Sequence, residues 1–79
     1  MPRYYFHVHG RCDRLTDEEG VVLPDTEAAW YQAVRSAREV IRADLQLGVA
    51  YDEQMIQIVD ERGAPVEHIP LAVVASYAM

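Results

Sequence analysis

The sequence predicts an α+β fold of ββαββ order, a roughly four-stranded antiparallel sheet with one helix packed on one face. One long segment, 25–48, has a helical rhythm of apolar residues. Short stretches on both sides of it are rich in alternating or β-branched residues, which is typical of strands. Two turns have the composition Asp-Glu-x-Gly. The turn at 17–20 lies between the two stretches before the helix, and the turn at 60–63 lies between the two stretches after it. The 79 residues are enough for a single small domain over 1–79.

The first pair of predicted strands lies before the helix. Tyr4–His9 alternates, so its side chains point to opposite faces in turn. Residues 11–17 are expected to form a loop or a frayed strand end. A type I turn at 17–20 leads to a short returning strand, Val21–Leu23, which Pro24 ends because proline donates no ladder hydrogen bond. The residues expected to face the helix are Tyr4, Phe6 and Val8.

The helix is predicted from Asp25 to Gly48. Asp25 is the expected N-cap, and Gly48 is the expected left-handed residue at the C-terminal end. Trp30 is expected to be the largest single part of the core. The apolar stripe consists of Ala29, Trp30, Ala33, Val34, Ala37, Val40, Ile41 and Leu45.

The second pair of strands follows the helix. A connector, 49–54, leads to a strand at Met55–Val59, and the chain returns as a fourth strand at Ala64–Leu71. Two prolines in the fourth strand favour an edge position. The C-terminal segment, 72–79, is apolar and carries no charged side chain. It is expected to add a strand or to form a contact between two copies of the chain.

Composition restricts the function classes. The chain is 51% hydrophobic and 25% charged, which is typical of a globular protein. Its net charge of −6 argues against nucleic-acid binding and is compatible with a basic protein partner. Cys12 is the only cysteine, so a disulfide within the chain is excluded and a cytoplasmic location is expected. No apolar run approaches the length of about 20 residues that a membrane span needs, and no membrane association is expected.

Two sets of residues are candidate partner-binding sites. One flank of the helix carries a tyrosine followed by arginines at steps of four, three and four, and its alternative explanation is a solvated helix face. Exposed apolar side chains in the C-terminal segment would favour a homodimer. The candidate residues are Tyr31, Arg35, Arg38, Arg42, Val73, Val74 and Tyr77.

A second hypothesis concerns metal or thiol chemistry. His7 and His9 share a strand face and could bind zinc, with His68 as a third ligand if the fourth strand lies beside the first. Cys12 lies close to arginines that could lower its thiol pKa. A polar outer sheet face and an inert cysteine are the simpler explanations, and no cofactor is expected. The sequence therefore favours a non-enzymatic interaction module over a small metal-binding or thiol enzyme that uses His7, His9 and Cys12.

The order of several motifs resembles a short, uncharacterised alphaproteobacterial domain family of unknown function. The motifs are Pro2-Arg3-Tyr4-Tyr5-Phe6-His7-Val8, Asp17-Glu18-Glu19-Gly20, Leu23-Pro24-Asp25, Ser36-Ala37-Arg38-Glu39 and Asp60-Glu61-Arg62-Gly63. This resemblance implies no activity. The Leu23-Pro24 entry and the alanine-rich helix also resemble, more weakly, HicB-like antitoxin domains. That likeness implies binding of a small basic toxin.

Overall fold

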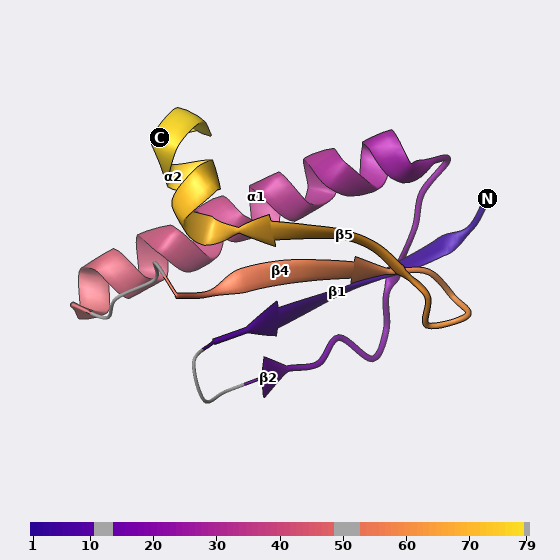
Figure 1. Ribbon diagram of the computed structural model, residues 1–79, viewed down its shortest axis with the longest axis horizontal. Coiled ribbons are helices and arrows are strands. Elements are labelled where there is room, and N and C mark those ends of the chain that lie inside the picture. Colours follow the sequence, from indigo (N-terminus) through magenta and orange to yellow (C-terminus); the bar gives the residue numbers. More distant parts are fainter. Residues whose placement is uncertain (11–13, 49–52, 79) are drawn as a thin grey trace.

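The protein consists of an antiparallel sheet with a long helix across one face (Figure 1). The computed structural model describes residues 1–10, 14–48 and 53–78. The α+β fold is thereby confirmed. The elements are β1 (Arg3–His9), β2 (Arg14–Leu15), β3 (Val21–Val22), α1 (Thr26–Leu47), β4 (Met55–Val59), β5 (Pro65–Pro70) and α2 (Leu71–Ala78).

The two central strands, β1 and β4, come from different halves of the chain. The strand order is β2-β1-β4-β5, and all neighbours are antiparallel. The predicted returning strand corresponds to β3, which pairs with the start of β1. β2 lies in the segment that was expected to be a loop or a frayed strand end, and it pairs with the end of β1. In place of a continuous strand, an aspartate side chain from the segment between β2 and β3 binds the middle of β1. β5 is an edge strand, as its two prolines predict.

The predicted ends of α1 are confirmed. The Asp25 carboxylate accepts a hydrogen bond from the Ala28 N–H at 2.9 Å, as an N-cap does. Gly48 is left-handed at φ 72°, and its N–H donates to the Asp44 carbonyl. The Asp44 carboxylate accepts from the Gln54 side-chain amide at 2.6 Å, which ties the last turns of α1 to the chain just before β4. Neither helix described by the structure combines the length and apolar character that crossing a membrane requires.

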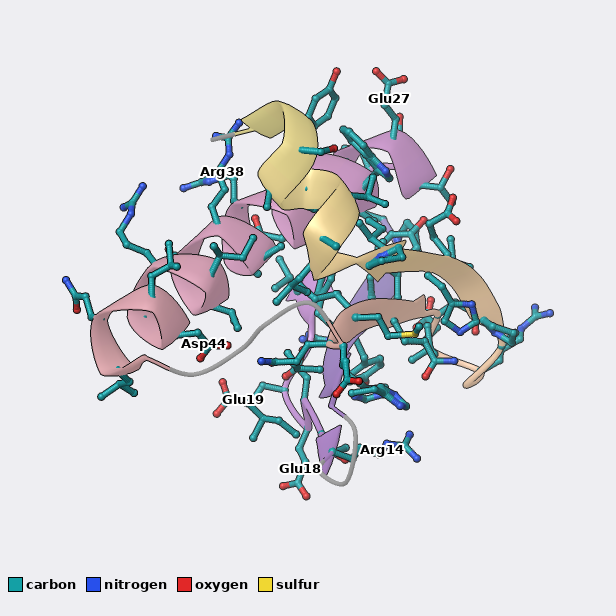
Figure 2. The ribbon with its side chains drawn as sticks, turned by 60° about the vertical axis from the view of Figure 1, so that its left-hand side comes forward. Arg14, Glu18, Glu19, Glu27, Arg38 and Asp44 are labelled. Carbon is teal, nitrogen blue, oxygen red and sulfur yellow. The ribbon has the colours of Figure 1, made fainter. Side chains whose placement is uncertain are left out.

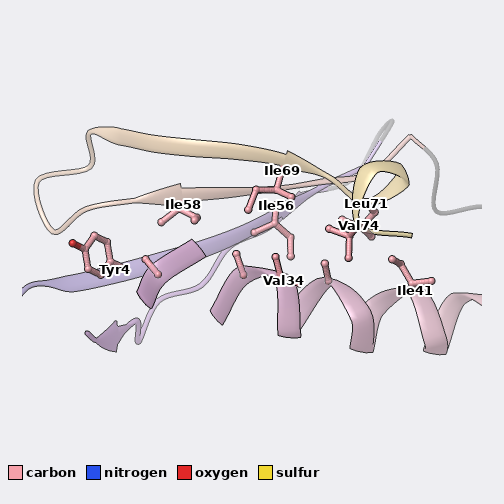
Figure 3. Packing of buried hydrophobic residues seen from close by; sticks show 11 residues of the cluster. Tyr4, Val34, Ile41, Ile56, Ile58, Ile69, Leu71 and Val74 are labelled. Carbon is pink, nitrogen blue, oxygen red and sulfur yellow. The ribbon is translucent and has the colours of Figure 1, made fainter. Parts of the chain in front are cut away.

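The hydrophobic core lies between α1 and the sheet (Figure 3). Three alanines of α1 are fully buried, and their small side chains allow the helix to pack closely on the strands. Phe6 and Val8 pack against this core with partial exposure, which confirms their predicted direction. Trp30 also packs against it but is only half-buried, so the expectation that it forms the largest part of the core is wrong. The core residues are Tyr4, Ala29, Ala33, Val34, Ala37, Ile41, Ile56, Ile58, Ile69, Leu71 and Val74.

The C-terminal segment forms a helix, so the expectation of an extra strand there is wrong. α2 begins where β5 ends and packs against α1 and β5. Leu71 and Val74 are both fully buried and lie near Ile41 (Figure 3). Residues three apart share a helix face but point to opposite faces of a strand. Only the helical form therefore buries both side chains in the same core.

Candidate interaction groove

An open groove lies between the first turns of α1 and the start of β5. Its volume is about 430 Å³, within the ~300–1,000 Å³ range that is typical of ligand sites. It is called the α1–β5 groove below. The residues that line it are Thr26, Glu27, Trp30, Tyr31, Val66 and Glu67.

Helical spacing explains why the groove side chains of α1 lie together. Once Asp25 starts the helix, Glu27 is three and four residues from Trp30 and Tyr31, so the three occupy neighbouring positions on its surface. β5 supplies the opposite wall from the edge of the sheet. Residues distant in the sequence thus form one site because α1 crosses the sheet toward β5 (Figure 1).

The groove contains two aromatic rings in contact. The ring centroids of Trp30 and Tyr31 are 5.3 Å apart and their planes are 81° apart, an edge-to-face arrangement. Tyr31 is 58% exposed, so much of its ring is accessible from solvent. Aromatic faces attract cations, and tryptophan does so most strongly. The pair therefore offers a surface on which a cationic group can bind.

The charged side chains that line the groove are all acidic. Glu27 comes from α1 and Glu67 from β5, and among the residues that the structure describes no arginine or histidine lines the groove. Glu27 projects outward from the first turn of α1 (Figure 2). The N-terminal end of a helix carries a partial positive charge, and acidic groups such as Asp25 and Glu27 offset it. The groove is therefore suited to a positively charged ligand.

The structure divides the predicted helix-flank site. Arg35, Arg38 and Arg42 are all exposed on α1, and Arg38 points away from the sheet (Figure 2). Tyr31 alone joins the α1–β5 groove. Sequence reasoning missed Glu27 and Glu67 as site residues. The spacing of Glu27 from Trp30 was a signal for the first, whereas Glu67 is placed there only by the packing of α1 beside β5.

The predicted tail site is also divided. Val74 is fully buried within the chain, so it cannot contact a partner in this fold, whereas Val73 is 46% exposed. The Tyr77 side chain lies outside the described residues. With Leu71 and Val74 inside the core, less apolar surface remains to favour a homodimer than the sequence suggested. The homodimer stays a prediction.

The predicted histidine site does not come together as expected. β4 lies between β1 and β5, so the condition for His68 to act as a third ligand is wrong. His7 and His68 share a row with Gln57 between them, and two strand spacings separate them by about 9–10 Å. Across residues 1–10, 14–48 and 53–78, no group of three histidine, cysteine, aspartate or glutamate side chains could hold a metal ion. Cys12 lies outside the described residues.

Asp17 joins β1 to the turn that precedes β3. Its carboxylate accepts hydrogen bonds from the N–H groups of Phe6 at 3.2 Å and of Glu19 and Gly20 at 3.1 Å. Burial raises the pKa of Asp17, but these three backbone donors outweigh it and hold the pKa below the ordinary 3.8. The Asp17 N–H in turn donates to His7 Nδ1 at 3.0 Å. The sequence predicted the turn at 17–20 but not the hydrogen bond from β1 to the Asp17 carboxylate.

The free energy of unfolding is expected to fall as the pH drops through the ordinary histidine value of 6.5. Burial lowers the pKa of His7, and the positive charge of Arg14 lowers it further, against the opposing effect of Asp17. The unfolded chain therefore takes up the proton first. His7 stabilises the fold fully above pH 6.5, and this stabilisation is lost as the pH falls toward the lowered pKa. Urea unfolding at a series of pH values measures the slope.

Two variants test this assignment to His7. His7→Gln is expected to flatten the dependence on pH near 6.5. His68→Gln changes an exposed histidine and is expected to leave the dependence unchanged. A slope that persists in His7→Gln would assign the effect to another group.

The fold and the groove define a small α+β protein with a helix on one face of an antiparallel sheet. The chain belongs to the family described as domain of unknown function (DUF6894), whose model matches residues 3–72. This confirms the resemblance to a short uncharacterised domain family, and the match includes every residue of the α1–β5 groove. No significant match was found among curated proteins or among solved structures. The alphaproteobacterial origin and the HicB likeness stay predictions.

Proposed function

We propose that the protein is a non-enzymatic interaction module that holds a basic segment of a partner protein in the α1–β5 groove. One observation carries the proposal: two aromatic rings and two carboxylates share a groove of about 430 Å³, and none of the described residues that line it is basic. A net charge of −6 would also attract a basic partner from a distance. A cytoplasmic location is part of the proposal, since Cys12 leaves no disulfide within the chain.

The energies favour a segment with several contacts over a single cation. An exposed ion pair contributes about 0–1 kcal/mol, and an exposed cation–π contact contributes about 0.5–1 kcal/mol. One arginine side chain touching Trp30 and Glu67 would therefore bind weakly. Micromolar affinity corresponds to roughly 8 kcal/mol, which requires further contacts with the rest of a peptide. The proposed ligand is thus a basic stretch of chain rather than a free amino acid.

Narrower and alternative functions differ in their support. An antitoxin-like role, in which the basic segment belongs to a small toxin, is the narrower form of the proposal and rests on the HicB likeness. Nucleic acid is a poor ligand for the groove because its phosphates would face Glu27 and Glu67. A metal-binding or thiol enzyme would need converging ligands or a positioned base. The described residues offer no such cluster to support it.

Trp30 allows a direct test, because it is the only tryptophan of the chain and it lines the groove. The test is a titration with a peptide that has capped termini and two arginines separated by one residue. This peptide is expected to give a saturable change in Trp30 fluorescence. Glu27→Gln and Glu67→Gln are each expected to weaken binding about threefold to tenfold, the loss of roughly 0.7–1.4 kcal/mol. Added salt should weaken binding in parallel.

A second acidic depression supplies the matched control. It has a volume of about 420 Å³ and is lined by Phe6 and by the segment 15–19. Glu18→Gln removes one charge there and is expected to leave the peptide affinity unchanged. The same peptide with glutamates in place of arginines should not bind. If Glu18→Gln weakens binding as much as Glu67→Gln does, the peptide responds to net charge and not to the groove.

A further inference from the structure

The outer edge of β5 forms the sheet side of the α1–β5 groove. In an antiparallel strand, alternate residues direct both N–H and C=O toward the same neighbour. The Leu71 N–H donates to the Gln54 carbonyl at 3.0 Å, on the β4 side. The His68 N–H, three positions earlier, instead meets the Glu67 carboxylate. The register of β5 with β4 is regular from Glu67 to Pro70 and shifts at Val66. The backbone groups of His68 therefore point outward, away from β4.

This edge carries few donors, and a groove residue covers one of them. Pro70 has no N–H, so within the regular pairing of 67–70 the outward N–H group is that of His68. The His68 N–H donates to Glu67 Oε1 at 3.2 Å, a weak bond made by an exposed side chain. The Glu67 carboxylate, one of the two that line the groove, thus also covers the edge of the sheet.

We infer that the basic segment binds as an extended strand added to the outer edge of β5, with its cationic side chains in the α1–β5 groove. This inference rests on the proposed function and adds the binding mode. The peptide backbone pairs with the outward N–H and C=O groups of His68, as in other cases of strand addition. Alternate side chains of such a strand share one face, so basic residues two apart both reach the groove.

Binding exchanges the partners of Glu67 without leaving a polar group unpaired. An arriving guanidinium or ammonium group pairs with the Glu67 carboxylate, and this draws the carboxylate from the His68 N–H. A peptide carbonyl then accepts from that N–H. A bond between two charged groups replaces a long bond in which only the carboxylate is charged, and the edge gains a regular ladder bond. Peptides without a cation lack the group that draws Glu67 away, which makes strand addition selective for basic segments.

The charges of the groove distinguish a basic peptide from a second copy of the chain. Two β5 strands paired edge to edge would bring Glu27 and Glu67 of both copies to one boundary. Four carboxylates without a basic lining residue would repel one another. A basic segment neutralises the same groups. The extent of the site is limited, because α2 begins at Leu71 directly after β5.

Backbone methylation of the peptide tests the binding mode. Two versions of the arginine peptide are made. One is N-methylated at the odd-numbered backbone amides and the other at the even-numbered ones, so each version changes the amides on one edge of the added strand. The version methylated on the edge toward β5 loses its donors and gains bulk, so its affinity is expected to fall at least tenfold. The other version is methylated on the edge toward solvent and should bind as the unmodified peptide does. Amide exchange at His68 should slow when the unmodified peptide is bound.

The outcomes separate this inference from the proposed function. If both methylated peptides bind as the unmodified one does, strand addition is overturned while the basic-segment proposal stands. If the unmodified peptide does not change Trp30 fluorescence, both are overturned. Slow His68 amide exchange in the chain alone, together with a dimer in sedimentation, would show that a second copy occupies the edge and would overturn the inference.

Discussion

Leu71→Ala is expected to lower the free energy of unfolding by about 2–5 kcal/mol, the range for leucine-to-alanine changes in a core. Leu71 is fully buried at the junction of β5 and α2. The variant loses its apolar contacts and leaves a cavity that the rigid sheet cannot fill. At ~0.05–0.15 kcal/mol per residue, a chain of 79 residues has a total stability of only about 4–12 kcal/mol. The variant should therefore melt at least about 8 °C lower, by roughly 4–8 °C per kcal/mol.

A second leucine supplies the control for this change. Leu47, at the end of α1, is 76% exposed, so Leu47→Ala removes the same atoms from a site that folding does not bury. Its free energy of unfolding should lie within about 0.5 kcal/mol of the wild-type value. Thermal unfolding of the pair, followed by circular dichroism, measures both. Equal melting temperatures would show that α2 does not pack on the core.

Asp17→Ala is expected to lower the free energy of unfolding by about 2–4 kcal/mol. The change removes the acceptor of three backbone N–H groups, and the Phe6 N–H lies in a part-buried position where water cannot fully replace it. Net contributions of hydrogen bonds to a charged group run at about 1.5–3 kcal/mol, reduced here by the exposure of the turn. Urea unfolding at neutral pH measures the loss.

Graded variants separate the hydrogen bonds of Asp17 from its charge. Asp17→Asn keeps one acceptor oxygen, so its loss of stability should lie between those of the wild type and Asp17→Ala. Glu18→Ala removes an exposed neighbouring carboxylate and should change the free energy of unfolding by less than about 0.5 kcal/mol. If Glu18→Ala lowers the free energy of unfolding as much as Asp17→Ala does, the loss comes from removing a negative charge from the turn and not from removing the hydrogen bonds to β1.

The candidate site was only partly predictable from the sequence. Tyr31 was assigned to a binding surface, and it lines the α1–β5 groove. Trp30 was assigned to the core, because helical periodicity places it on the apolar stripe but does not show where the sheet ends. Glu67 belongs to the groove only because β5 is the strand beside the start of α1. The order of strands in a sheet depends on contacts between distant segments, which periodicity does not report.

Local interactions are enough to specify several elements from the sequence. Asp25 and Gly48 set the ends of α1 through bonds to residues within one turn, and the alternation of Tyr4–His9 set the faces of β1. Contacts between distant segments select the other features: the helical form of 71–78, the separation of His7 from His68 by β4, and the hydrogen bond from β1 to Asp17. Each of these depends on which distant surface is present to bury a side chain or accept a hydrogen bond, so the free energy that selects it exists only in the folded chain.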